Sequence, residues 1–223
     1  MDDRRTESLY LELVDLDREI YLNERAPQIL AGSGAERLTC WQNLVPNRSD
    51  LPRRLDEFRW LAVFEADLSF IAPAGCDGVV GLHFIRTARP GQGRLSPNDT
   101  VGLLLVLISP KYPAESASLR AWADFVHLKH IAEAVVPGYA MITPYERSPS
   151  DREAGRDEPL FLHFYEMDTV DAEAAFQRMT PMVAARLGGF ESPDFERWAG
   201  HQSLRIDYVS TFRRIGEPRT PEP

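Results

Sequence analysis

The residues best suited to chemistry in this sequence are two histidines three positions apart, His127 and His130, with acidic neighbours on either side. On a helix, residues at this spacing lie on adjacent parts of one face, with Asp124 one turn before His127 and Glu133 one turn after His130. Imidazole titrates near neutral pH, so the pattern is typical of proton transfer, and we take His130 as the candidate general acid or base. The alternative for either histidine is a partly buried ring bonded to a backbone group.

The sequence does not predict a metal site. His-x-x-His supplies two ligands, and no third ligand stands at a recognisable spacing. The two cysteines, Cys40 and Cys76, lack a CxxC motif and indicate reduced thiols rather than a disulfide framework or a zinc site. Gly-x-Ser-x-Gly, Walker and dinucleotide-binding fingerprints are absent from the sequence. We expect neither a metal nor a cofactor.

The histidine pair lies in a segment that predicts a strand, a helix and two further strands. The apolar run Leu103–Ile108 is typical of a central, buried strand. A helix is expected from about residue 114 to residue 136, where Pro137-Gly138 ends it, because proline cannot continue the helix and glycine tolerates the left-handed cap. Two strands of alternating pattern, Tyr139–Tyr145 and Leu160–Glu166, then follow.

Composition and charge restrict the kinds of partner. The 223 residues, 43% of them hydrophobic, suffice for one large domain or two small ones of about 100 residues each. A net charge of −9 and a pI near 5.1, without a dense basic cluster, argue against nucleic-acid binding. The N-terminal residues lack a signal-peptide apolar region, and no apolar run approaches about 20 residues, so we expect no membrane span and a cytoplasmic protein.

The order of elements repeats along the chain. Strands are expected in the first half at 9–14, 37–44, 58–65 and 79–86, with a helix at 17–31 after the first of them. In the second half a helix at 168–187 and a strand at 204–212 complete the same order. Phe64-Glu65-Ala66-Asp67 and Tyr165-Glu166-Met167-Asp168 stand at equivalent points, where the third strand of each half ends.

The boundary between the halves is predicted in residues 87–100, which are dense in Gly, Pro and polar side chains. We therefore divide the chain into an N-terminal unit at 1–95, a C-terminal unit at 96–216 and a flexible tail at 217–223.

A family resemblance follows from His130-Ile131, Pro137-Gly138-Tyr139 and Tyr145, which mark the end of a helix, a turn and the end of a strand. This pattern resembles the EthD-like branch of the dimeric α+β-barrel superfamily. The resemblance implies an α+β fold with two ferredoxin-like βαββαβ halves, here fused as an intramolecular dimeric α+β barrel with helices outside. The first half matches only in element order and has Ala26 where His130 stands, which suggests one working half and one degenerate half.

In such a barrel the alternating strands predict a pocket between the sheets. On strand Leu160–Glu166, Leu162 and Phe164 are expected to pack on the helices, and the residues that alternate with them to face the interior. Aromatic, methionine, hydroxyl and imidazole groups suit a pocket for an apolar ligand. The alternative is an ordinary core between the sheets, but burying so many Tyr and His groups without partners is costly and favours a cavity. The predicted substrate-binding residues are His127, Tyr139, Met141, Thr143, Tyr145, Phe161, His163 and Tyr165.

The resemblance implies a cofactor-free enzyme that acts on a small, apolar carbonyl or aromatic compound by proton transfer, as a lyase, isomerase or cyclase. His130 would be its acid or base. The alternatives are a cofactor-free oxygenase and a non-catalytic ligand-binding protein on the same barrel. A haem-dependent reaction would require one histidine as axial ligand in a wide cavity. We expect a monomer, with the pseudo-dimer inside one chain, or a homodimer.

Overall fold

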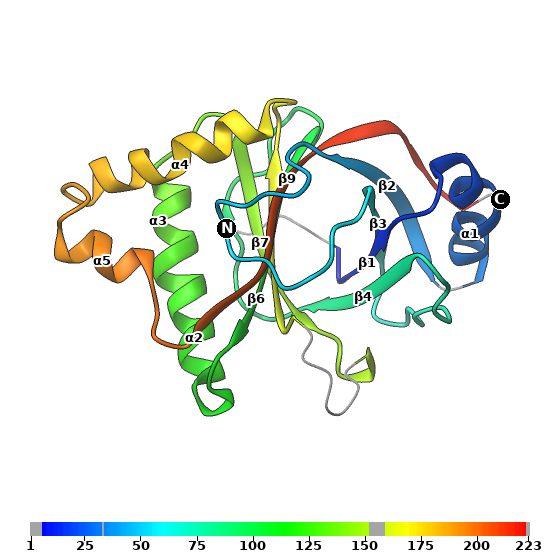
Figure 1. Ribbon diagram of the computed structural model, residues 1–223, viewed down its shortest axis with the longest axis horizontal. Helices are drawn as coiled ribbons and strands as arrows, with labels where there is room; N and C mark the ends of the chain where they lie inside the picture. The colour runs from blue at the N-terminus through cyan, green and yellow to red at the C-terminus, as the bar shows by residue number, and fades with distance from the viewer. Residues whose placement is uncertain (1–5, 33, 152–158, 222–223) are drawn as a thin grey trace.

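The computed structural model describes residues 6–32, 34–151 and 159–221. Within these ranges eight long antiparallel strands close into a barrel, and the helices lie outside it (Figure 1). The strands of the first half are β1 (Ser8–Val14), β2 (Ala35–Asn43), β3 (Trp60–Ala66) and β4 (Val79–Arg86). Those of the second half are β6 (Gly102–Pro110), β7 (Tyr139–Arg147), β8 (Phe161–Met167) and β9 (Leu204–Arg219).

The strand order confirms the predicted pair of ferredoxin-like halves. The first half has the order β4-β1-β3-β2 and the second half the equivalent order β9-β6-β8-β7. The halves join along β2 and β9 at one seam, and β4 pairs with β7 through Phe84–Arg147, Ile85–Glu146 and Arg86–Tyr145 at the other. A short strand, β5 (Gln92–Gly93), comes from the predicted boundary segment and pairs with β7.

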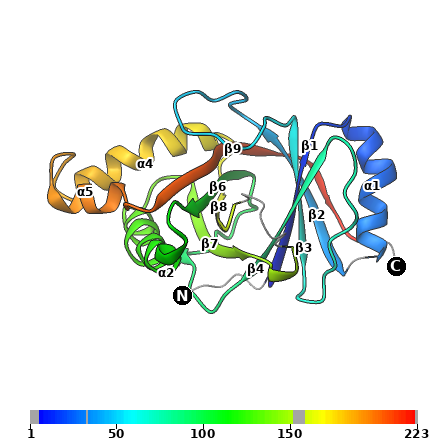
Figure 2. The ribbon, with the colours of Figure 1, turned by 60° about the horizontal axis from the view of Figure 1, so that its bottom comes forward.

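The helices are distributed unequally between the halves. Figure 2 shows α1 (Arg18–Gly32) on one side of the barrel and the helices of the second half on the opposite side. The first half has no second helix in the described residues, because the proline-containing segment 67–78 forms turns instead. The helical elements of the second half are η1 (Pro113–Glu115), α2 (Ser116–Trp122), η2 (Ala123–His127), α3 (Leu128–Glu133), η3 (Pro149–Asp151), α4 (Ala172–Arg186) and α5 (Pro193–Ala199).

The expected helix at about 114–136 is present but irregular. Its middle turn, η2, is a π-helical turn, and α3 ends at Glu133, a little before the expected stop. Val135 and Gly138 then adopt left-handed backbone angles, with φ values of 52° and 93°. The glycine therefore has the conformational role that the sequence predicts for it.

The end of the chain also differs from expectation. Strand β9 continues to Arg219, where it pairs with Leu38 of β2, so the segment predicted as a flexible tail begins inside the sheet. The last part of that tail, residues 222–223, lies outside the described residues.

Three layers of apolar side chains hold this arrangement together. The barrel interior contains side chains from both halves, including Leu11, Leu61, Leu105, Leu162 and Phe212. A second cluster lies between α1 and the outer face of the first half. The remaining apolar residues lie between the outer face of the second half and its helices, in two further clusters. Strands such as β8 therefore bury both of their faces, whereas β4 leaves Val80 exposed.

Gly102 is expected to be intolerant of a side chain. A Cβ atom at this position of β6 would lie 2.2 Å from the backbone oxygen of Thr169, which precedes α4. Because a backbone oxygen cannot swing aside, Gly102→Ala should lower the free energy of unfolding by about 1–3 kcal/mol. Gly200→Ala is the control, since nothing lies within 4 Å of the added Cβ and its φ of −154° suits any residue. Equal denaturant midpoints for the two variants would contradict this prediction.

Candidate functional site

A cavity of about 280 Å³ lies between the outer face of the second half's sheet and its covering helices. We call it the helix–sheet pocket. Most of its lining is apolar or aromatic, and the polar side chains in it include His127, His163 and Tyr165. The apolar lining includes Leu104, Val106 and Ile108 of β6, Trp122 of α2, Phe176 and Met179 of α4, and Trp198 of α5. Its volume lies near the lower end of the roughly 300–1,000 Å³ found for small-molecule pockets, so it suits a small ligand.

His127 is held in a fixed orientation by α5. Its Nδ1 lies 3.1 Å from the backbone oxygen of Trp198, while the Trp198 indole Nε1 donates to the backbone oxygen of His127, also at 3.1 Å. The two rings are stacked, with centroids 4.9 Å apart and planes inclined by 10°. A carbonyl accepts only from a protonated nitrogen, so this contact assigns the proton to Nδ1 and leaves Nε2 as an acceptor.

The π-helical turn contributes to this geometry. His127 is the last residue of η2, and π-turns interrupt the regular stacking of helix side chains and occur often at functional sites. The Trp122 indole Nε1 also donates to α5, to the backbone oxygen of Arg197 at 2.8 Å. Two tryptophan N–H groups therefore fix the short helix α5 against the π-turn and close one side of the pocket.

Both histidines of the pocket are uncharged at neutral pH. Burial lowers the pKa of His163 to about 3 and that of His127 to about 4. For His127 the hydrogen bond to Trp198 opposes this shift and favours the protonated ring. His163 is 3% exposed, and its Nδ1 has no hydrogen-bond partner among the described residues. A buried ring nitrogen without a hydrogen-bond partner lowers the stability of the folded protein.

The structure corrects the predicted direction of strand β8. Leu162 and Phe164 lie in the barrel interior, whereas Tyr165 packs under the helices and His163 lines the helix–sheet pocket. Phe161 also lies on the helix side, in contact with Leu119 and Ala123 in their apolar cluster. The alternation is therefore as expected, but the two faces are exchanged, because both faces of β8 are buried and apolar residues occur on each.

Strand β7 is split by a bulge. Tyr145 belongs to the interior core as predicted, and Thr143 and Met141 share its face by alternation. The register shifts between Tyr139 and Ile142, so Tyr139 turns to the helix side, where its ring meets that of Tyr165 edge to face at 5.9 Å. Of the predicted residues of β7, only Tyr139 therefore lies near the helix–sheet pocket.

His130 does not line the helix–sheet pocket. Its ring Nδ1 is 3.3 Å from a carboxylate oxygen of Glu133, which in turn accepts a hydrogen bond from Arg186 of α4. Its side chain is 29% exposed and does not contribute to the lining of the helix–sheet pocket. The structure thus places His127, His163 and Tyr165 in the lining of one pocket and leaves His130 outside that lining. A catalytic role for His130 stays a prediction.

The corresponding face of the first half carries a polar cluster within its apolar packing under α1. Glu12 of β1, fully buried under α1, accepts hydrogen bonds from the hydroxyls of Tyr10 and Tyr21 at 2.9 and 2.5 Å. The Arg25 guanidinium binds the same carboxylate through two nitrogens, with Nη2 at 2.5 Å and Nε at 2.9 Å from Oε1. The charge and the hydroxyl groups of this cluster are thus paired with one another. The assignment of one working half and one degenerate half stays a prediction.

Several pocket residues escape prediction from the sequence. Trp122, Phe176, Met179 and Trp198 come from three different helices, and only the fold brings them together. Helix α5 had a usable signal, because Ser192 caps it by accepting from the backbone N–H of Phe195 and Pro193 begins it. Nothing in the sequence marks the π-turn that aims His127.

Neither a metal centre nor a membrane-spanning helix emerges from the described ranges. They contain no group of three or more His, Cys, Asp or Glu side chains arranged to hold a metal ion. None of their helices combines the length and apolar character needed to cross a bilayer.

Comparison with solved structures places the fold. A proposed monooxygenase of Fusobacterium nucleatum matches 97% of this chain and 96% of its own, with a TM-score of 0.51 and 6% identity. A mutant chlorite dismutase of Candidatus Nitrospira defluvii matches 96% of this chain and 93% of its own, with a TM-score of 0.52 and 9% identity. No protein-family model and no curated protein sequence matches the chain. The chain therefore has the dimeric α+β-barrel fold, with both ferredoxin-like halves in a single polypeptide.

Proposed function

We propose that the protein is an enzyme for a small, neutral, largely apolar aromatic or carbonyl compound bound in the helix–sheet pocket, with His127 as the proton acceptor. The observation that carries this proposal is the orientation of His127 by Trp198, which leaves the ring's Nε2 as an acceptor in an apolar cavity. Among the described residues, lysine, arginine, aspartate and glutamate are missing from the lining, so an ionic substrate would be desolvated without compensation.

Two contacts of His127 favour proton transfer to its ring and oppose the burial that lowers its pKa to about 4. When Nε2 takes a proton from an acidic O–H or C–H of the substrate, the ring becomes an imidazolium. The backbone oxygen of Trp198 then accepts a stronger, charge-assisted hydrogen bond, and the stacked indole attracts the cation. His163, uncharged and only 3% exposed, is placed to hydrogen-bond the oxygen on which the substrate's negative charge develops.

Two outcomes are open to the substrate anion. In lyase, isomerase or cyclase chemistry the proton returns from His127 to another atom, or a leaving group departs. In oxygenase chemistry the anion reacts with dioxygen, one oxygen atom enters the product as a carbonyl, and the other leaves as water with electrons supplied by the substrate. The fold shared with a proposed monooxygenase supports including the second outcome.

Haem does not fit the residues present. The lining, as far as the described residues form it, lacks Arg and Lys side chains to pair with the carboxylates of a haem, and the cavity of about 280 Å³ is narrow for a macrocycle. We therefore derive no step through haem. The EthD-like assignment of the second half, the division at 1–95 and 96–216, and monomer or homodimer assembly remain our proposals.

His127→Gln is expected to lower turnover by about 100-fold or more, because glutamine keeps hydrogen-bonding groups but does not act as a base. A panel of neutral phenols, quinols and cyclic ketones under air supplies the substrates. Oxygen uptake identifies oxygenase chemistry, and deuterium incorporation from D₂O identifies isomerisation.

His130→Gln is the matched control, since it makes the same change on the same helical segment outside the pocket. An unchanged rate in well-folded His127→Gln would contradict the proposal. A large loss confined to His130→Gln would transfer the role of base to that residue.

A further inference from the structure

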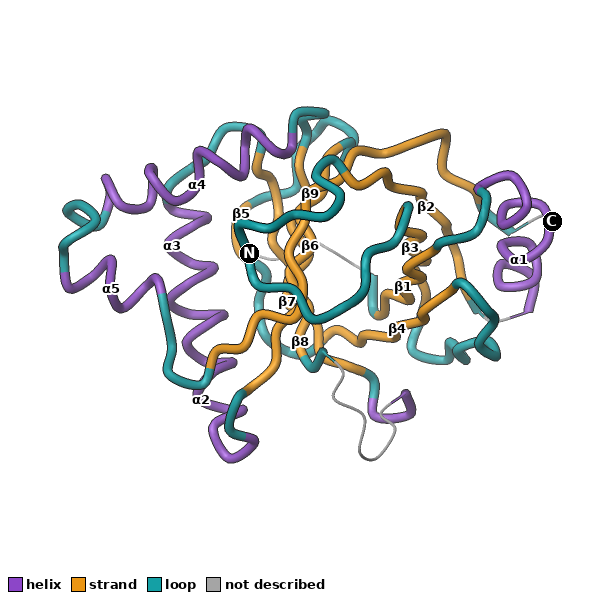
Figure 3. Tube along the Cα trace, viewed as in Figure 1, coloured by secondary structure: helices purple, strands orange, loops and turns teal. Residues whose placement is uncertain are grey.

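A loop of the first half forms part of the second half's pocket. Residues 44–59 connect β2 to β3, and we call this loop the strap; it passes across β9 toward α4 (Figures 1 and 3). Its backbone is tied to β9 by hydrogen bonds from Leu44 N to Thr211 O at 2.9 Å and from Arg54 N to Asp207 O at 2.8 Å. Leu51, between these two ties, lines the helix–sheet pocket.

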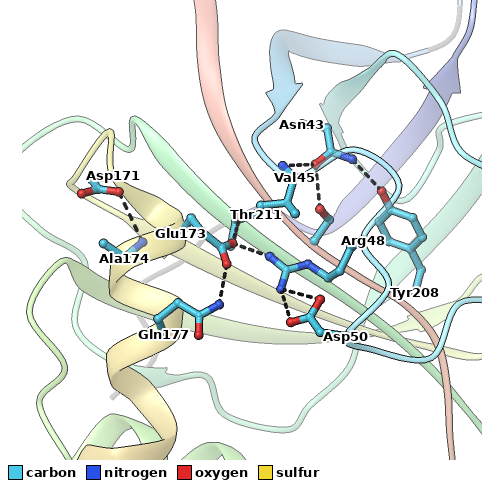
Figure 4. A network of polar contacts seen from close by, with 11 residues as sticks. Asn43, Val45, Arg48, Asp50, Asp171, Glu173, Ala174, Gln177, Tyr208 and Thr211 are labelled. Atoms are coloured by element: carbon cyan, nitrogen blue, oxygen red, sulfur yellow. Dashed lines mark hydrogen bonds and ion pairs between the residues drawn. The ribbon is translucent and has the colours of Figure 1, made fainter.

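A buried ion pair fixes the strap on α4. The Arg48 side chain is 1% exposed, and its Nη2 contacts the carboxylate of Glu173 in the first turn of α4 (Figure 4). The guanidinium also lies 5.2 Å from the ring centroid of Phe176, another pocket residue, and 3.1 Å from the largely exposed carboxylate of Asp50. A buried arginine that loses its partner is costly, so this contact holds the strap in one position.

Glu173 is itself held firmly. Its carboxylate accepts from Thr211 Oγ1 at 2.5 Å and from Gln177 Nε2 at 2.7 Å, in addition to Arg48 (Figure 4). A carboxylate in the first turn of a helix is also favoured by the positive end of the helix dipole. Glu173 therefore connects α4 to the strap through Arg48 and to β9 through Thr211. These contacts fix the position of the strap, and with it that of Leu51.

The strap divides its two central leucines between different compartments. Leu51 contacts the pocket and its apolar cluster, whereas Leu55 packs against the core of the barrel interior. The strap thus contributes one leucine to the lining of the helix–sheet pocket and one to the packing of the barrel interior. The two positions carry the same residue type on the same segment, and only one of them faces the pocket.

We propose that the strap of the first half sets the size of ligand that the pocket of the second half admits, with Leu51 as the limiting side chain and the Arg48–Glu173 pair as its anchor. This inference rests on the pocket of the proposed function and is independent of the reaction that takes place there. The degenerate half would then serve as a specificity element for the working half.

Calorimetric binding of phenol and 1-naphthol tests the role of Leu51. Leu51→Ala should raise the affinity ratio of naphthol to phenol by about tenfold or more, because the shortened side chain makes room for the second ring. Leu51→Trp should weaken both probes by filling the space. Leu55→Ala should leave the ratio within about twofold of wild type, although it also removes a partly buried leucine.

Stopped-flow binding of phenol tests the anchor. Arg48→Met should raise both association and dissociation rates by about fivefold or more, because the strap is no longer held against α4. Asp50→Asn, which neutralises the exposed partner of Arg48, should leave both rates within about twofold.

An unchanged ratio of naphthol to phenol affinity in Leu51→Ala would overturn the inference. The inference would also be overturned if neither the wild type nor any variant bound phenol or 1-naphthol. A shifted ratio supports it even if His127→Gln retains full turnover, a result that would overturn the proposed function alone.

Discussion

Arg25→Met is expected to lower the free energy of unfolding by about 3–5 kcal/mol, because it leaves the buried carboxylate of Glu12 without its cation. Glu12 is fully enclosed, and the Arg25 side chain is 14% exposed, so little water is at hand to replace the guanidinium. The hydroxyls of Tyr10 and Tyr21 would still donate to Glu12, but neutral donors offset only part of the loss. Urea denaturation at neutral pH measures the effect.

Repeating Arg25→Met in a Glu12→Gln protein distinguishes the loss of charge pairing from the loss of packing. With Glu12→Gln already present, Arg25→Met should cost much less, since no negative charge is left uncompensated. Arg18→Met, which breaks the exposed contact with Glu19, is the surface control and should cost less than about 0.5 kcal/mol. If Arg25→Met were equally costly in both backgrounds, the loss would come from the aliphatic part of the arginine.

Acidification from about pH 6.5 to pH 4 is expected to remove several kcal/mol of stability, with His163 as the principal source. The unfolded chain binds a proton at this histidine near pH 6.5, whereas burial holds the folded pKa near 3. Unfolding therefore takes up a proton throughout this interval, and stability falls by about 1.4 kcal/mol per pH unit for each such group. His127, with a folded pKa near 4, adds a contribution of the same sign.

The contribution of His163 is fully present above about pH 6.5 and is lost as the pH falls toward 3. His163→Gln should accordingly lower the slope of the unfolding free energy against pH by the contribution of one proton, about 1.4 kcal/mol per pH unit. His201→Gln removes a histidine that contacts Trp122 from outside the pocket lining and serves as the control. A slope that is identical in the wild type and His163→Gln would show that His163 titrates freely in the folded protein.

The sequence predicted the order of elements better than it predicted which way they face. Apolar runs and Gly-Pro punctuation located β6, the helix after it and the strands β7 and β8 nearly at their observed bounds. They could not orient β8, because alternation defines two faces and both faces of this strand are buried. A one-residue bulge likewise turns the Tyr139 side chain to the opposite face of the sheet, and the residue types around it do not predict this bulge.

The candidate site was predicted only in part, for a related reason. The cost of burying His163 and Tyr165 pointed to a cavity between the sheets, whereas these residues line a cavity between the sheet and its helices. The sequence led us to prefer His130 over His127, because local spacing could not show that a π-helical turn orients His127 toward α5. The sequence could not predict Leu51 as a pocket residue. It belongs to the other half and lines the pocket only because long-range hydrogen bonds hold its loop on β9.

Joining both halves in one polypeptide also changes what a single substitution can do. In a symmetric pair of identical subunits, every replacement is made twice, so a residue that closes one cavity is also present beside the other. Here Leu51 and Glu12 have no obligatory copies, and the strap and the Glu12–Arg25 cluster can be altered separately. The symmetry between the halves is broken within the covalent chain, so under our proposals one half would select the ligand and the other would convert it.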